Sequence, residues 1–85
     1  MEDHQTLKLK IRYFASLRDG AGKSEEWIES TAKTAAGAYA EIKQKYGFVL
    51  DSSELRAAVN GSFAEMDSSL KNGDELVFIP PVSGG

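Results

Sequence analysis

The sequence predicts an α+β fold in which one main helix packs on one face of a sheet and an extended tail follows the last strand. Apolar and charged residues alternate over 7–13, which is typical of a strand with one buried face. Apolar residues recur at helical spacing over 35–46 and predict an amphipathic helix. A short apolar run at 75–79, ended by a proline pair, predicts the final strand.

Size and composition exclude several classes of function. The 85 residues are enough for one domain with a modest core, since 41% of them are hydrophobic. Without cysteine the chain forms no disulfide, thiolate metal site or thiol nucleophile. The net charge of −3 argues against nucleic acid as a partner, because such binding requires a concentrated basic face. With no long apolar run and no signal-peptide layout, we expect a cytoplasmic protein that has no membrane partner.

The residue directly after the first strand, Phe14, breaks the alternation because it places an aromatic side chain on the polar side. It either begins a turn or stands exposed as a sticky residue. Asp19-Gly20-Ala21-Gly22 has the composition of a turn. Residues 23–29 then predict a second strand, most simply a hairpin partner of the first, with Ile28 inside and Trp27 partly exposed.

The helix over 35–46 carries signals at both of its ends. Thr34 is typical of an N-cap, because its hydroxyl can accept a hydrogen bond from the opening N–H groups. Gly47 stands where a left-handed C-terminal cap is expected. This helix is the most strongly specified element of the sequence.

The second half of the chain predicts three further strands separated by turns. Residues 55–60 form one strand, and Asn60-Gly61 is a strong hairpin signal with 62–64 as the short return. Polar turns follow over 67–74, with one anchoring leucine. Residues 75–79 are apolar on both faces, as in a central strand that is covered on both sides.

A single helix covers only one face of so small a sheet, so some apolar residues need other cover. Val77 and Ile79 are on the face that the helix does not cover. Together with Phe14 and Phe63, Ile79 predicts one exposed apolar patch, and such patches mark partner surfaces. The alternative is that Phe14, Phe63 and Ile79 merely fill a distorted core.

The last six residues, Pro80-Pro81-Val82-Ser83-Gly84-Gly85, predict an extended tail on a domain that spans 1–79. A proline pair has few backbone states and lacks N–H groups, so it stops a strand and keeps the following chain extended. The two glycines carry no side chain, which leaves a thin tip that ends in the α-carboxylate of Gly85. Six extended residues reach about 20 Å, enough to enter another protein's active site. A frayed end or a cloning scar is the alternative.

The order strand, strand, helix, strand, short strand, strand is that of the β-grasp, or ubiquitin-like, fold with its mixed sheet. Within it, Ala57-Ala58-Val59-Asn60, the run Leu70-Lys71-Asn72-Gly73-Asp74-Glu75 and the ending Phe78 to Gly85 closely resemble the MoaD/ThiS family. The likeness is greatest to the small sulfur-carrying subunits of molybdopterin synthase, which share the Pro-Pro-Val-Ser-Gly-Gly ending. Thiamin-pathway carriers look similar but usually lack the proline pair. Family members often have two phenylalanines before the prolines, whereas the second position here is Ile79.

The resemblance implies a carrier that is not an enzyme by itself. Gly85 would be adenylated by an ATP-using adenylyltransferase of the ubiquitin-activating type, and a persulfide sulfur donor would then convert it to a thiocarboxylate. The tail, made of Pro80, Pro81, Val82, Ser83 and Gly84, would enter a channel of the large synthase subunit and deliver sulfur to cyclic pyranopterin monophosphate. The family's apolar contact surface falls on Phe14, Phe63 and Ile79. No metal and no permanently bound cofactor are implied.

The chemistry of the terminus agrees with this scheme. A free α-carboxylate has a pKa of about 3.3–3.7, so at neutral pH it is an anion that can attack the α-phosphorus of ATP. A sulfur nucleophile can then displace AMP from the mixed anhydride. Two alternatives remain open: a sulfur carrier of another, thiamin-type pathway, and a ubiquitin-like modifier conjugated through Gly85. A free-standing enzyme is disfavoured, because the sequence offers no catalytic constellation and no metal-ligand spacing.

Overall fold

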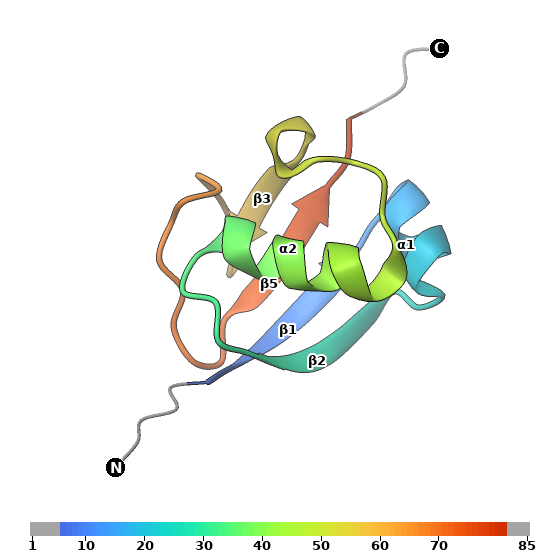
Figure 1. The fold of residues 1–85 in the computed structure, drawn as a ribbon. Helices are drawn as coiled ribbons and strands as arrows, with labels where there is room; N and C mark the ends of the chain where they lie inside the picture. The colour runs from blue at the N-terminus through green and yellow to red at the C-terminus, as the bar shows by residue number, and fades with distance from the viewer. Residues whose placement is uncertain (1–5, 82–85) are drawn as a thin grey trace.

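The computed structural model describes residues 6–81 and contains one five-stranded mixed sheet with one long helix across it (Figure 1). The strand order is β2-β1-β5-β3-β4; β1 and β5 run parallel, and the other neighbouring strands are antiparallel. In chain order the elements are β1 (Leu7–Tyr13), α1 (Ala15–Ala21), β2 (Glu25–Ser30), α2 (Ala35–Tyr46), the 3-10 turn η1 (Ser52–Glu54), β3 (Arg56–Val59), β4 (Ser62–Ala64) and β5 (Glu75–Ile79).

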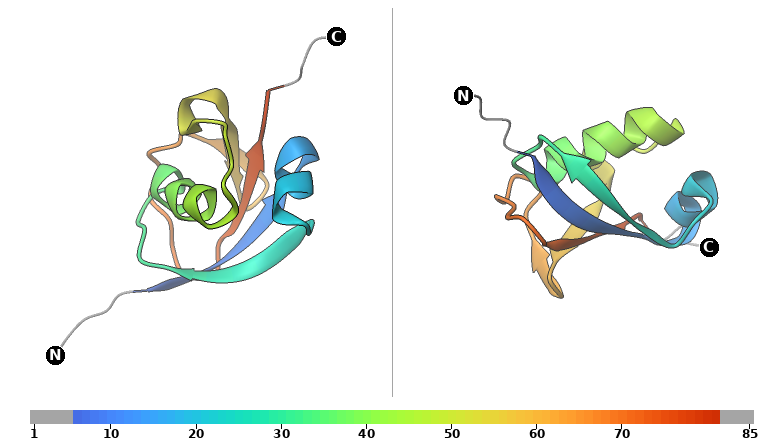
Figure 2. Two further views of the ribbon diagram at one scale, coloured as in Figure 1. Left: turned by 45° about the vertical axis from the view of Figure 1, so that its right-hand side comes forward. Right: turned by 90° about the horizontal axis from the view of Figure 1, so that it is seen from below.

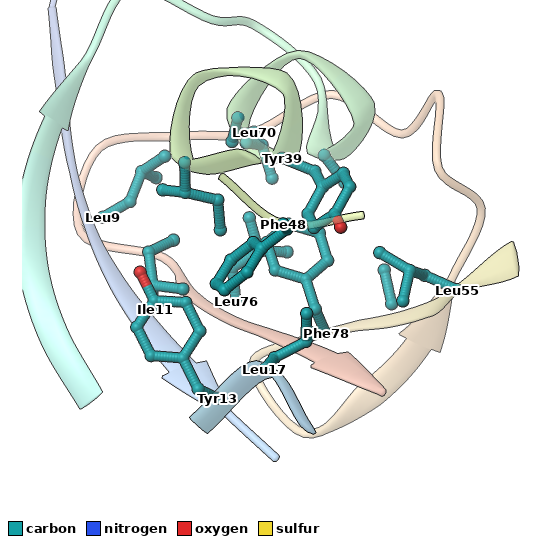
Figure 3. Packing of buried hydrophobic residues seen from close by; sticks show 14 residues of the cluster. Leu9, Ile11, Tyr13, Leu17, Tyr39, Phe48, Leu55, Leu70, Leu76 and Phe78 are labelled. Carbon is teal, nitrogen blue, oxygen red and sulfur yellow. The ribbon is translucent and has the colours of Figure 1, made fainter. Parts of the chain in front are cut away.

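The central strand is β5, as its apolar character on both faces predicts. Leu76 and Phe78 are fully buried on the face that α2 covers, and they pair in register with Ile11 and Tyr13 of β1. Figure 3 shows these side chains packed beneath α2. Because β5 lies between β1 and β3, both of its edges are hydrogen-bonded to neighbouring strands.

Helix α2 has the two ends that the sequence predicts. The Thr34 hydroxyl accepts a hydrogen bond from the Gly37 N–H at 3.1 Å, which satisfies one of the free donors of the first turn. At the other end Gly47 is left-handed, with φ 73°, and its N–H donates to the carbonyl of Lys43. The buried residues of α2, among them Tyr39 and Ile42, all face the sheet.

The β3–β4 hairpin is also confirmed, and so are the polar turns before β5. Asn60 and Gly61 both have positive φ, as a two-residue hairpin turn of this hand requires. Leu70 is the buried anchor of the turn segment, and Gly73 has φ 90° in the tight turn that precedes β5. The β-grasp arrangement inferred from the strand order is therefore present.

The turn predicted at Asp19-Gly20-Ala21-Gly22 is wrong, because its first three residues belong to α1. Only Gly22 is a turn residue: it caps the helix with φ 77°. Packing explains why residue 20 is a glycine, since a Cβ there would lie 2.8 Å from the ring of Phe48. Leu17, which is buried, anchors α1 to the core. The β1–β2 pair is therefore joined through a helix and not through a tight hairpin.

Helix α2 covers one face of the sheet, and no helix within residues 6–81 lies on the other face (Figure 2). We call this second surface the open face; it consists of the outward side chains of the five strands. Trp27 is 59% exposed on it, whereas Ile28 lies half-buried on the helix side, as predicted. The open face is where the candidate site lies.

Candidate functional site

The base of the tail is the end of β5. Ile79 is the last strand residue and is half-buried; Pro80 after it is buried, and Pro81 is exposed. This end of β5 lies at the same end of the sheet as α1 and η1 (Figure 1). The rest of the predicted tail, Val82, Ser83, Gly84 and Gly85, lies outside the described residues.

Strand register places four apolar residues together on the open face. Phe63 of β4 pairs with Ala58 of β3, and Ala58 pairs in turn with Val77 of β5. Paired residues point to the same face of a sheet, so these three form one row. Ile79 belongs to the next row, two residues further along β5, where it pairs with Arg56. Phe63 is 74% exposed, so it does not fill the core.

Phe14 completes this surface at its other end. It stands one residue beyond Tyr13, whose pair with Phe78 is the last of the β1–β5 register, so extending that register by one residue would set Phe14 next to Ile79. Phe14 is 46% exposed, and it also forms the N-cap position of α1. Of the two interpretations of this residue, exposure is confirmed, whereas Phe14 begins helix α1 and not the predicted turn. We call Phe14, Ala58, Phe63, Val77 and Ile79 the apolar patch.

The other half of the open face is occupied by ion pairs. Glu25 of β2 lies 3.5 Å from Lys10 Nζ and 3.7 Å from Arg12 Nε, and Arg12 Nη1 lies 3.4 Å from Glu75. These charged groups border the apolar patch along β1. Trp27 is also exposed on this half, among the charged residues, whereas the outward apolar residues of β3, β4 and β5 lie together in the apolar patch.

A shallow groove of about 540 Å³ adjoins Phe63, and its lining includes the charged residues Glu54, Arg56 and Glu65. It lies between β4 and the segment from η1 to β3, with Leu55 and Met66 among its lining residues. The groove is a concave surface next to Phe63, the most exposed phenylalanine of the described residues. Sequence analysis missed this groove and the place of Ala58, because both depend on the β3–β4 register and not on any local pattern.

The strongest electrostatic cluster lies on the opposite, helix-covered face. The Glu26 carboxylate accepts hydrogen bonds from the hydroxyls of Tyr13 at 2.5 Å and Tyr46 at 2.6 Å, and it lies near Lys23 and Lys45. Burial acts to raise the pKa of Glu26, but the hydrogen bonds from Tyr13, Tyr46 and Lys23 outweigh it, so this pKa lies below its usual range. Burial and the bond to Glu26 raise the pKa of Tyr13. This cluster joins α2 to the sheet.

Within residues 6–81, no three metal-binding side chains gather into one group. The helices of this described part are also too short and polar to span a membrane. The chemistry predicted for the chain belongs to Gly85, which the structure does not describe. The described body contributes a surface, the apolar patch, and the strand end at Ile79 that precedes Pro80.

Comparisons with known proteins agree with this arrangement. Residues 11–85 match the ThiS family. The molybdopterin synthase sulfur carrier subunit of Haemophilus influenzae is 32% identical over 80 residues, which cover 91% of this chain and 99% of that protein. A structure from Pyrococcus furiosus, provisionally named molybdopterin converting factor, subunit 1, is 32% identical with a TM-score of 0.72 and covers 89% of this chain and 99% of its own.

A third similarity concerns the fold alone. The solution structure of small archaeal modifier protein 1 from Methanosarcina acetivorans has a TM-score of 0.77 at 22% identity, and it covers 95% of this chain and 99% of its own. The β-grasp body is thus shared with a protein that is named a modifier. The match over residues 11–85, together with the strand order, shows that the chain belongs to the ThiS family.

Proposed function

We propose that the chain is a sulfur carrier that acts in the cytoplasm as the small, non-catalytic subunit of molybdopterin synthase. The observation that carries the proposal is the position of Ile79, which ends the central strand and belongs to the apolar patch. The six residues that follow it are the proposed tail, and they end on two glycines. The relative from Haemophilus influenzae, which matches over nearly the full chain, is named a sulfur carrier subunit of that enzyme.

The proposed reaction takes place at the terminal carboxylate. An oxygen of Gly85 attacks the α-phosphorus of ATP, pyrophosphate leaves, and an acyl-adenylate forms on the adenylyltransferase. The terminal sulfur of a persulfide donor then attacks the carbonyl carbon and AMP leaves. A thiol reductant cleaves the remaining S–S bond and frees the thiocarboxylate. The carrier supplies neither acid nor base in these steps; it supplies a terminus thin enough for a dry, narrow site, where electrostatic stabilisation is strong.

The proposed partner surface is the apolar patch. Phe14, Phe63 and Ile79 would contact the large subunit, with the charged half of the open face at the rim. Interfaces of this kind place aromatic and aliphatic anchors at the centre and polar groups around them. Because Ile79 directly precedes Pro80, docking of the patch would fix the direction in which the tail enters the partner.

Intact mass of the protein purified from its native host tests the chemistry. A species heavier by the difference between sulfur and oxygen, located at Gly85, supports the carrier. Branched conjugates joined through Gly85 to lysines would instead support a ubiquitin-like modifier. The decisive genetic test removes Gly84 and Gly85: restored molybdopterin formation by this truncated chain, in cells that lack the native protein, would contradict the proposal.

A charge placed in the apolar patch tests the docking. Burying an isoleucine side chain is worth about 1.5–3 kcal/mol, and a buried unpaired charge costs more. We expect Ile79→Asp to weaken binding of the large subunit at least about tenfold, as measured by calorimetry. Val49→Asp is the matched control, since Val49 is exposed on the loop after α2, away from the open face. Equal binding by both variants would refute the patch assignment.

A further inference from the structure

Among residues 6–81, two residues other than glycine have a positive φ, and only one of them lies in a hairpin. Asn60 has φ 52° in the β3–β4 hairpin, where such a conformation is required, and asparagine tolerates it. Its side chain also bonds to the Glu75 N–H and to Asp74. Ala15 likewise has φ 52°, but it lies in no hairpin. An L-alanine in this region brings its Cβ against the carbonyl oxygen.

Ala15 stands at the corner between the apolar patch and the core. Phe14 is extended, with φ −121° and ψ 148°, and belongs to the open face. Its carbonyl accepts hydrogen bonds from the N–H groups of Leu17 at 3.0 Å and Arg18 at 3.4 Å, and Leu17 is buried in the core. The left-handed Ala15 therefore lies between the exposed Phe14 and the buried Leu17, at the point where β1 gives way to α1.

The choice of alanine at this corner is informative, because the other left-handed positions of residues 6–81 carry glycine or, at Asn60, a residue that tolerates this conformation. Gly22, Gly47, Gly61 and Gly73 all have positive φ. Glycine would reach the same conformation at Ala15 without strain, but it would also reach many others. Backbone strain of this kind persists where the surrounding contacts hold the residue in place, and strained residues cluster at functional sites.

We propose that Ala15 is a positioning residue that holds Phe14 on the open face beside Ile79, ready to dock. The inference rests on the proposed function, in which the apolar patch binds the large synthase subunit. Alanine narrows the range of backbone angles at the corner, so Phe14 keeps one orientation in the free protein. The partner then does not have to order this side chain when it binds, which favours affinity.

Three variants of the full chain test this role. In Ala15→Gly the corner gains freedom, so we expect binding of the large subunit to weaken about two- to fivefold, from the difference in backbone entropy between glycine and alanine. The thermal midpoint should not fall, because strain is relieved. Ala15→Asn keeps a side chain that tolerates the left-handed region and should bind like the parent. Ala40→Gly, exposed on α2, is the control: it should lower the midpoint and leave binding unchanged.

A second readout needs no partner. Backbone order parameters from nitrogen-15 relaxation should fall at Phe14 and Ala15 in Ala15→Gly and stay at parental values in Ala15→Asn. Unchanged order together with unchanged binding would overturn the proposal. A lower midpoint in Ala15→Gly would also overturn it, since the methyl group would then act through stability.

The Ile79→Asp variant separates this inference from the proposed function. If Ile79→Asp weakens binding and Ala15→Gly does not, the positioning role fails while docking through the apolar patch stands. If neither variant affects binding, the patch itself is wrongly assigned and both proposals fail.

Discussion

Replacing Glu26 by glutamine tests which contacts hold helix α2 against the sheet. The carboxylate is 12% exposed and accepts hydrogen bonds from Tyr13 in β1 and Tyr46 at the end of α2. It therefore joins three elements, since Glu26 itself lies in β2. Glutamine has nearly the same shape, so the change removes the charge and leaves the packing in place. We expect Glu26→Gln to destabilise the fold without altering the open face.

The size of the effect follows from the contacts. A hydrogen bond to a charged group contributes about 1.5–3 kcal/mol to stability, and a neutral bond contributes about 0.5–1.5. Each tyrosine bond therefore loses about 1 kcal/mol, or about 2 kcal/mol for the pair. The ammonium groups of Lys23 and Lys45 are exposed, so their loss adds little. The total of about 2 kcal/mol is a substantial share of the roughly 4–13 kcal/mol expected for 85 residues.

The same contacts predict how the contribution of Glu26 to the free energy of unfolding changes with pH. Folding lowers the pKa of Glu26 below its value in the unfolded chain, which is about 4.3. The contribution of Glu26 is therefore complete above that value, and it is lost as the pH falls through the folded pKa. The difference between parent and Glu26→Gln should be constant from about pH 6 to 8 and should shrink below about pH 4.

Urea unfolding followed by circular dichroism at pH 3 to 8 measures this difference. Glu29→Gln is the control, because Glu29 is an exposed glutamate of the same strand. It should change the free energy of unfolding by less than about 0.5 kcal/mol. A loss in Glu26→Gln that is equally large at pH 3 and pH 7 would show that the carboxylate charge is not its source. Large-subunit binding at pH 7 should be unchanged in both variants.

Two further changes test the tail and the helix. Gly84→Ala adds a methyl group at the narrow tip, so it should slow adenylation and sulfur transfer in a reconstituted assay without lowering the thermal midpoint; unchanged transfer would count against a tightly enclosed tail. Thr34→Ala removes the hydroxyl that accepts from the Gly37 N–H and should cost about 1 kcal/mol in urea unfolding, whereas Thr31→Ala, exposed in the preceding loop, should cost much less.

Where a structural element is fixed by its own residues, the sequence was sufficient to predict it. The alternation in β1, the cap at Thr34, the left-handed Gly47 and the hairpin signal at Asn60-Gly61 all act within a few residues. Each of these features is present in the structure. The candidate surface was predictable for a related reason: period two along β5 assigns Val77 and Ile79 to one face whatever lies above it.

The errors come from contacts between distant segments. Gly20 and Gly22 looked alike in sequence, but only Gly22 has a left-handed backbone. Gly20 is a glycine because the Phe48 ring lies against it, and Phe48 is 28 residues further along the chain by position number. The residues around Gly20 do not indicate this contact, so the sequence predicted a turn where the end of α1 lies. The groove beside Phe63 was missed for the same reason, since it depends on where β4 leaves β3.

The core and the proposed function place conflicting demands on β5, and its register satisfies both. Leu76 and Phe78 must point toward α2, which leaves Val77 and Ile79 on the open face. A slip of one residue would exchange these two sets and move the base of the tail by about 3.3 Å.

Asn60 opposes such a slip at the start of β5. Its N–H donates to the Glu75 carbonyl at 2.8 Å, and its side-chain oxygen accepts from the Glu75 N–H at 2.9 Å. In the proposed carrier, the docking surface and the reach of the tail are therefore not independent features. Both are set by the packing of two side chains in the core, so a change that loosens Leu76 or Phe78 should impair sulfur transfer even when the tail itself is intact.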